Sequence, residues 1–273
     1  MEHEVGYVSK YLTHFVGRSK APAQQYEVLK RVLGTRWLTH PPHLDQPSLA
    51  IEVHPGRQFA DNDMMVPEMI CFCDIPAIHL GIHIQKYSQF GIVFPKAYLI
   101  GLGANPVLYV ATRSGVLRKK PEFRKAVLPK KTITPTEYEE LKRQAMDPDK
   151  FAFEPRGTVL EEHMRMFWEL WYAKEPFEKG SAGPEVAAVL QRDKRMWAFF
   201  VMHTLGFVKC FDDALPVDDP DNFYMEREWR CLGNLHFEET NVAAVYVPPE
   251  MVEQCRSDCL EYAERVQPLP AEK

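Results

Sequence analysis

Short apolar runs, separated by glycine, proline and polar residues, lie towards both ends of the chain and predict β-strands. The run MICFCDI is a clear example, because Pro76 ends it and its apolar residues fit a buried strand. The predicted strands cover residues 7–16, 69–75, 91–94, 106–111, 207–211, 223–232 and 242–247.

Apolar residues at helical spacing predict helices between and after these strands. Pro22 and Gly34 bound the first helix, and Thr134 with Glu137 forms a capping box for another. The predicted helices run over residues 22–33, 77–87, 135–146, from 158 onward, 184–204 and 249–266. Residues 37–67 predict a long irregular connection, and 96–101 fit neither pattern clearly.

Strands at both ends with helices between them indicate an α+β fold. The pattern contains no clean linker, internal repeat or low-complexity tract. We therefore expect one domain over residues 1–273, with a core of 1–112 and 207–273 and a mainly helical insertion of 113–206.

Composition narrows the possible classes of protein. The 273 residues are 45% hydrophobic and 26% charged, which excludes global disorder. No apolar run reaches the roughly 20 residues of a membrane helix, and the N-terminus does not resemble a secretory signal, so we expect a cytoplasmic protein. The net charge of −5 disfavours non-specific coating of DNA. Six cysteines are too sparse for a disulfide scaffold.

The segment FYMEREWR contains the sharpest candidate chemistry. In a strand, Tyr224, Glu226, Glu228 and Arg230 would share one face. Two carboxylates side by side repel each other, and the arginine would compensate them. The simpler interpretation is a solvated strand face with a local ion pair.

Two further segments supply candidate ligand-binding side chains. Tyr11 and His14 lie in the opening strand, on opposite faces unless a bulge changes their direction. Tyr87, Ser88 and Gly91 lie at a helix-to-strand junction, where a glycine permits close approach of a ligand to the backbone. Taken alone, each segment is explained by ordinary packing or by an ordinary turn.

A zinc site and a nucleic-acid contact are weaker alternatives. Cys71, Cys73, His79 and His83 have ligand chemistry for zinc, but their spacing matches no familiar zinc module, and thiols in an apolar strand usually belong to the core. We therefore predict no metal ligand. A basic stretch could contact phosphate, although a solvated loop explains it as well. Its basic residues are Arg118, Lys119, Lys120, Arg124, Lys125, Lys130 and Lys131.

The order of several segments resembles a known family. A Tyr-x-x-His-Phe opening is followed by YEVLKRVL, MICFCDIP, HIQKYSQFGIVFPKAYLIGLGANPVLYV and, far downstream, FYMEREWR. This order is similar to that of the AbiGi family of bacterial abortive phage-infection proteins. The resemblance implies a phage-defence role. It also implies the alternative of a non-catalytic antitoxin that binds a nucleotidyltransferase-like toxin or its own promoter.

A more distant resemblance, to the ADP-ribosyltransferase superfamily, implies a chemistry and a fold. That superfamily has an aromatic, arginine or histidine residue on its first core strand, a small polar or aromatic position in the middle and a Glu-x-Glu on a late strand. Here Glu228 and Glu226 match the late strand as catalytic residues, and the sequence lacks the Ser-Thr-Ser of one subgroup. The resemblance implies a core of short strands with flanking helices, and NAD as substrate. The NAD-binding candidates it implies are Tyr11, His14, Cys73, Tyr87 and Ser88.

The acceptor of an ADP-ribosyl group stays open between nucleic acid and protein. Walker, Rossmann, serine-hydrolase and zincin signatures are all absent from the sequence.

Overall fold

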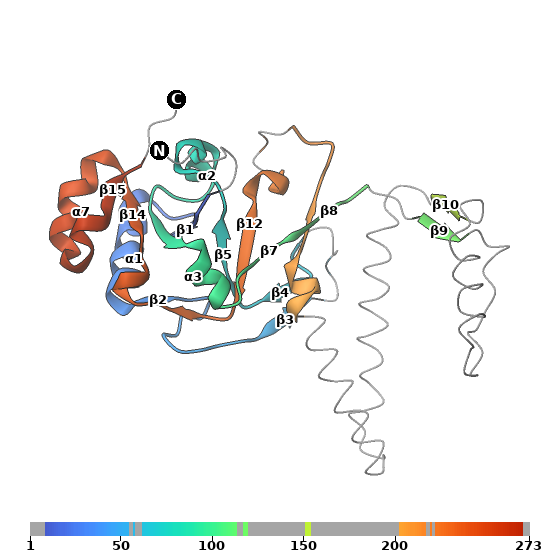
Figure 1. The fold of residues 1–273 in the computed structure, drawn as a ribbon, viewed down its shortest axis with the longest axis horizontal. Helices are drawn as coiled ribbons and strands as arrows, with labels where there is room; N and C mark the ends of the chain where they lie inside the picture. The colour runs from blue at the N-terminus through green and yellow to red at the C-terminus, as the bar shows by residue number, and fades with distance from the viewer. Residues whose placement is uncertain are drawn as a thin grey trace, which may run out of the picture.

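The fold was obtained as a computed structural model, which describes residues 9–54, 57, 62–113, 117–119, 151–153, 202–216, 219 and 222–269. Strands and helices are both present, which confirms the predicted α+β class (Figure 1). Two predicted helices (135–146 and from 158), residues 184–201 of the third (184–204) and most of the basic stretch lie outside the described residues, so the helical insertion stays a prediction.

The centre of the fold is a seven-stranded mixed sheet (Figure 1). Its neighbouring strands are antiparallel, apart from the parallel pair at one edge. From that edge the order is β15 (Val266–Pro268), β14 (Ala244–Val247), β6 (Gly91–Pro95), β1 (Tyr11–Phe15), β5 (Met69–Cys73), β12 (Glu228–Leu232) and β7 (Asn105–Pro106).

Four two-stranded ladders accompany the main sheet within the described ranges. One of them, the parallel pair β8–β11, aligns Lys209 with Tyr109. The ladders are β2 (Trp37–Leu38) with β13 (Leu235–His236), β3 (Ile51–Val53) with β4 (Met65–Pro67), β8 (Leu108–Ala111) with β11 (Val208–Phe211), and β9 (Leu117–Lys119) with β10 (Phe151–Phe153).

The described helices are mostly short. The four α-helices are α1 (Pro22–Thr35), α2 (Gly81–Lys86), α3 (Lys96–Gly101) and α7 (Val252–Asp258). The 3₁₀ turns are η2 (Ala77–His79), η6 (Leu205–Phe207), η7 (Phe223–Glu226), η8 (Glu239–Asn241), η9 (Pro249–Met251) and η10 (Leu260–Arg265).

Strand alternation gives the sheet two chemically different faces. On the face that we call the core face, Leu12, Phe94 and Phe72 pack in the main hydrophobic core. The helix α1 covers this core with one apolar stripe, because its buried Tyr26, Leu29, Val32 and Leu33 recur at helical spacing.

The opposite face, which we call the cleft face, carries smaller and polar residues. The pairing Thr13↔Cys73↔Glu228 runs across three adjacent strands, and Cys71 pairs with Arg230 one step further along. Since paired residues of adjacent strands point to the same face, these five side chains share one side of the sheet.

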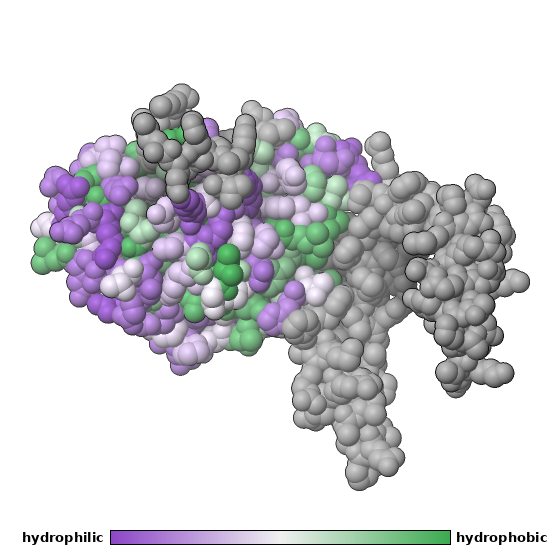
Figure 2. Space-filling model, in the orientation of Figure 1, coloured by the Kyte–Doolittle hydropathy of each residue, from purple (hydrophilic) through white to green (hydrophobic). Residues whose placement is uncertain are grey.

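Figure 1 separates the two ends of the sheet. The helices α1 and α7 lie at one end, where the Tyr26 hydroxyl donates a 2.9 Å hydrogen bond to Asp258, whereas β8 and β12 lie towards the other. Figure 2 shows a mostly hydrophilic surface at the α1 and α7 end and more hydrophobic residues towards the β8 end.

Several predicted elements need correction. The predicted strand 223–232 is wrong in its first half, because residues 223–226 form the 3₁₀ turn η7 and the strand begins at Glu228. The predicted helix 249–266 is broken into η9, α7 and η10, and its last residue opens β15. The irregular connection 37–67 includes the short strands β2, β3 and β4.

Candidate functional site

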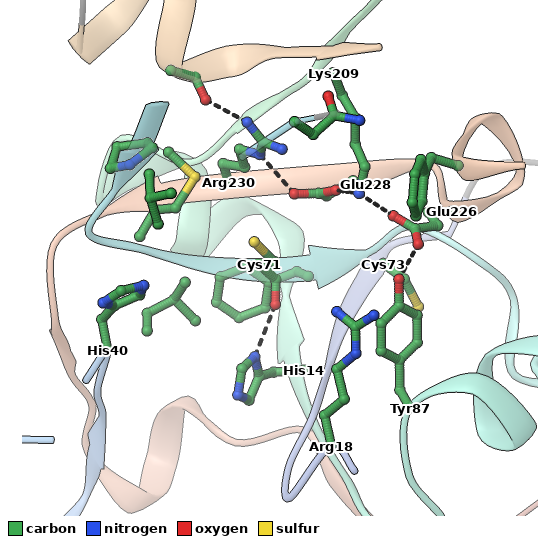
Figure 3. Close-up of a pocket in the computed structure, with 18 of the residues that line it drawn as sticks. His14, Arg18, His40, Cys71, Cys73, Tyr87, Lys209, Glu226, Glu228 and Arg230 are labelled. Atoms are coloured by element: carbon green, nitrogen blue, oxygen red, sulfur yellow. Dashed lines mark hydrogen bonds and ion pairs between the residues drawn. The ribbon is translucent and has the colours of Figure 1, made fainter. Parts of the chain in front are cut away.

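A cleft of about 550 Å³ opens on the cleft face of the sheet, beside Lys209, Glu226 and Glu228 (Figure 3). Its walls come from β1, β5, β11 and β12, from the turn η7 and from the end of α2. β1, β5 and α2 lie far in the sequence from β11, η7 and β12, so the fold brings these two groups of side chains together.

Two glutamates meet at one lysine in this cleft. Glu226 and Glu228 are each only 5% exposed, and the Lys209 Nζ donates hydrogen bonds to both carboxylates. Between the glutamates, Arg227 adopts the left-handed conformation with φ 43°, and its carbonyl accepts a 3.1 Å hydrogen bond from the Asp74 N–H. This turn lets Glu226, at the end of η7, reach the same lysine as Glu228 in the strand.

Each glutamate also has a second cationic partner. The Arg230 Nε donates to Glu228 Oε1 at 2.6 Å, and Lys86 Nζ donates to Glu226 Oε1 at 2.8 Å. Burial alone would raise the pKa of Glu228, but Arg230 and Lys209 outweigh it and lower the pKa to about 2. The Glu228 carboxylate is therefore ionised at neutral pH.

Lys209 is charged for the reciprocal reason. Burial alone would lower the pKa of this ammonium, yet Glu228 and Glu226 outweigh burial, and the net direction is upward. The three cations Lys86, Lys209 and Arg230 thus surround two carboxylates, and the network carries a net positive charge.

The strand that carries Lys209 is fastened to the rest of the cleft. Arg230 Nη1 donates to the carbonyls of Gly206 and Val208. The Asn62 side chain donates to the Cys210 carbonyl at 2.9 Å and accepts from the Cys210 N–H at 2.7 Å. These contacts hold β11 next to the two carboxylates.

Aromatic rings and cations alternate along one wall. The Tyr87 hydroxyl donates to Glu226, and the Arg18 guanidinium lies 4.9 Å from the centroid of the Tyr87 ring. On the other side, Phe223 has Lys86 at 4.4 Å and Lys209 at 4.7 Å from its centroid. Such a wall can accept a flat ring and an anionic group together.

His14 lines the cleft from β1, where its ring packs against Phe72 at 5.7 Å between centroids. The strands β1 and β5 are registered only at Thr13↔Cys73, and beyond this pair the His14 Nδ1 hydrogen-bonds the Cys71 carbonyl at 2.8 Å (Figure 3). Burial lowers the pKa of His14, so the imidazole is neutral at pH 7.

The fold therefore brings together five of the seven side chains chosen from the sequence. These are His14, Cys73, Tyr87, Glu226 and Glu228. The other two are outside the cleft lining. Tyr11 is 45% exposed at the start of β1, and buried Ser88 accepts a 3.0 Å hydrogen bond from the Phe90 N–H.

Tyr224 also departs from the expectation that it shares a face with Glu226. Its side chain is 55% exposed and packs with Phe211 at 5.0 Å and Tyr109 at 5.3 Å between ring centroids. The Tyr109 hydroxyl in turn accepts the Glu228 N–H at 2.7 Å and so helps to hold the start of β12.

Sequence reasoning missed Lys209, Lys86 and Arg18. A signal existed for Lys209, because it is the only charged residue in the apolar run Phe207–Phe211. Lys86 and Arg18 gave no such signal, since each lies in an ordinary polar segment. Only the tertiary fold brings Lys86 to Glu226 and Arg18 to the cleft wall.

The zinc interpretation gains no support. Within the ranges that the structure describes, no cluster of three or more histidine, cysteine, aspartate or glutamate side chains could hold a metal ion. Burial raises the pKa of the Cys73 thiol to about 12, so this thiol stays protonated at neutral pH. Of the described helices, none has the length and apolar character needed to cross a membrane.

Fold and site thus define an α+β protein with a buried carboxylate–lysine network in an open cleft. The chain belongs to the AbiGi family, whose model, described as "Putative abortive phage resistance protein AbiGi, antitoxin", matches residues 64–256. This membership assigns the protein to abortive-infection defence against phage. No curated protein matches the chain. No solved structure matches it either.

Proposed function

We propose that the cleft binds NAD and transfers its ADP-ribosyl group to an acceptor. The observation that carries this proposal is the convergence of Glu226 and Glu228 with Tyr87 and His14 on one cleft. A resemblance in the order of the segments would have no chemical meaning if these side chains lay on unrelated surfaces.

Size and polar chemistry of the cleft fit such a substrate. A volume of about 550 Å³ lies within the range of roughly 300–1,000 Å³ that is usual for ligand sites. His83, only 3% exposed, lines the cleft, and neither of its ring nitrogens has a hydrogen-bond partner of normal length within the described residues. Apart from a backbone contact with Glu226, this buried imidazole has no hydrogen-bond partner within the described residues, so it can bind a polar group of a ligand.

The reaction needs a fixed negative charge, which Glu228 supplies. The bond between the ribose C1′ and the nicotinamide nitrogen breaks, and its electron pair leaves with neutral nicotinamide. Positive charge then develops on the ribose, where an ionised carboxylate stabilises it. Glu226 accepts the proton that the acceptor oxygen or nitrogen loses as it bonds to C1′. With water as acceptor, the products are ADP-ribose and a proton.

The direct test uses NAD labelled in its adenylate phosphate, incubated with the protein and cell extract. We expect nicotinamide release and transfer of the label, both reduced about 10²–10³-fold in Glu228→Gln because the charge stabilisation is lost. Glu239→Gln is the matched control, since Glu239 pairs with Arg265 outside the cleft. Equal activity of wild type and Glu228→Gln, or none in either, contradicts the proposal.

The same labelled product identifies the acceptor. Label that nuclease digestion removes indicates nucleic acid, which the basic stretch of Arg118 and Lys119 in β9 would help to hold. Label that only protease removes indicates a protein acceptor.

The family description favours a second candidate function, that of an antitoxin that binds a toxin. Apolar side chains that could contact a protein are exposed at the end of α3 and in β8, with Ile100 51%, Leu102 46% and Leu108 56% exposed. Co-purification of the neighbouring gene product, lost in Leu108→Glu, would support this candidate. Depletion of NAD by the isolated protein would leave it unnecessary.

A further inference from the structure

Lys209 occupies a position that the proposed reaction cannot leave unchanged. Its ammonium hydrogen-bonds one oxygen of Glu228, the carboxylate assigned to the reacting ribose. It also hydrogen-bonds one oxygen of Glu226, the carboxylate assigned to the acceptor. Arg230 takes the other oxygen of Glu228 at 2.6 Å. Both oxygens of Glu228 are therefore already neutralised by cations.

A carboxylate paired in this way stabilises a developing positive charge poorly. The ribosyl cation and the ammonium of Lys209 need the same negative charge, and in a buried site the repulsion between two nearby cations is large compared with that in water. Lys209 and the reacting ribose thus compete for Glu228. Arg230 also neutralises Glu228, but its Nη1 bonds to the Gly206 and Val208 carbonyls hold it in place. Within the described residues, by contrast, the Lys209 ammonium hydrogen-bonds only the two carboxylates.

We propose that Lys209 is an internal cationic competitor of the substrate, which holds the cleft in a low-activity state until β11 withdraws. This inference rests on the proposed function and names a regulatory residue of the same site. Lys209 lies on β11, a strand outside the seven-stranded sheet that pairs with β8. A shift of β11 would break its contacts with Arg230 and Asn62 but no ladder of the central sheet.

Asn62 holds β11 in the position in which Lys209 contacts the glutamates. Its side chain both donates to and accepts from the backbone of Cys210, the residue after Lys209. Loss of these two hydrogen bonds lets β11 move away from the carboxylates, while the lysine itself is kept.

The network tolerates the loss of Lys209 better than the loss of either glutamate. In Lys209→Met, Glu228 keeps Arg230, and Glu226 keeps Lys86 and the Tyr87 hydroxyl. No carboxylate is left buried without a partner, which is the situation that usually unfolds a protein.

The experiment compares the affinity for NAD, by calorimetry, and nicotinamide release in the full chain of wild type, Lys209→Met and Asn62→Ala. We expect Lys209→Met to bind NAD about tenfold more tightly and to release nicotinamide about tenfold faster at low NAD, the order expected for one screened charge. Asn62→Ala should change both quantities in the same direction by about threefold. It is the second variant in case Lys209→Met does not fold.

Lys96→Met is the matched control. Lys96 is also a lysine paired with a buried acid, Asp74 at 2.8 Å, but neither residue lines the cleft. Its substitution should lower the melting temperature without changing the affinity for NAD.

The outcomes separate this inference from the proposed function. If the wild type is active but NAD binding and turnover are unchanged or weaker in both Lys209→Met and Asn62→Ala, the role of Lys209 as a competitor is wrong. The proposed transferase activity then still stands. Absence of NAD binding and turnover in wild type and both variants overturns the proposed function itself, and the competitor with it.

Discussion

The side chains on the two faces of the central sheet are buried to similar degrees, but apolar packing buries one face and ion pairs compensate the other. On the core face, Phe72 is 3% exposed and Phe94 is fully buried. Glu228 on the cleft face and Glu226 in the adjoining turn η7 are each 5% exposed. Apolar burial stabilises the core face directly. Charged groups must first lose their hydration, and their ion pairs offset that cost without a reliable surplus.

The comparison teaches that burial by itself does not identify a core. A row of charges kept out of water at such a cost, beside an open cleft, is typical of a site selected for function rather than for stability. The predictions below test whether the two faces differ in this way.

The largest effect is expected on the core face. Phe94→Ala removes a fully buried ring that contacts Phe72, Tyr98 and Phe237 with centroid distances of 5.2–6.3 Å. We expect the free energy of unfolding to fall by about 3–5 kcal/mol in urea denaturation. Leu260→Ala, at a side chain that is 77% exposed, should change it by less than about 0.5 kcal/mol. Similar losses of stability in the two variants would show that Phe94 does not lie in the hydrophobic core.

A smaller effect is expected when one cation of the cleft face is removed. Arg230→Met leaves Glu228 with Lys209 as its remaining cationic partner and leaves the Gly206 carbonyl without this donor. Because a buried charge is then only partly compensated, we expect a loss of about 3 kcal/mol in the same assay.

Arg113→Met is the control for this prediction. Arg113 pairs with Asp213 at 3.0 Å, but both side chains are more than 40% exposed. Screening by water makes such pairs contribute little, so no measurable change is expected. If Arg230→Met were equally silent, the cleft network would be an exposed ion pair and the contrast between the two faces would disappear.

The smallest effect is expected in the pH dependence of the free energy of unfolding, to which Glu228 on the cleft face contributes and the apolar core face does not. Glu228 has a pKa of about 2 in the folded protein against an ordinary value of 4.5, so the unfolded chain binds more protons between these values. Its contribution is fully present above about pH 4.5 and is lost as the pH falls towards 2. Stability should therefore fall progressively as the pH drops through that window.

Glu228→Gln tests the origin of this loss, because it removes the titrating group and should flatten the acid limb of the stability curve. Phe94→Leu, on the core face, should keep the slope of the wild type and only displace the curve. An unchanged acid limb in Glu228→Gln would mean that other carboxyl groups produce the loss.

Sequence patterns predicted the central strands well where each strand is apolar and is ended by proline or glycine. The strands β5, β6 and β14 are the clearest cases, because alternating or continuous apolar residues leave one buried arrangement. The prediction failed at residues 223–226, where a left-handed Arg227 separates a 3₁₀ turn from the strand. Periodicity contains no information about such a turn, since a left-handed arginine is an exception to local preference.

Candidate residues followed the same division. The Glu-x-Glu spacing and the Tyr87 junction could be chosen from the sequence, because they combine unusual side chains at short range. The choice between Tyr11 and His14 could not be made, because it depends on where β1 and β5 separate.

The sequence by itself determined the α+β class, the central strands, the resemblance to AbiGi and the two glutamates, since these depend on residues that are near one another in the chain. Only the tertiary structure decided that Lys209 and Lys86 pair with those glutamates and that Tyr11 and Ser88 stay outside the cleft. The physical reason is that charge compensation acts through space. A lysine 17 residues from Glu226 and another 140 residues away are equal partners once the strands are packed.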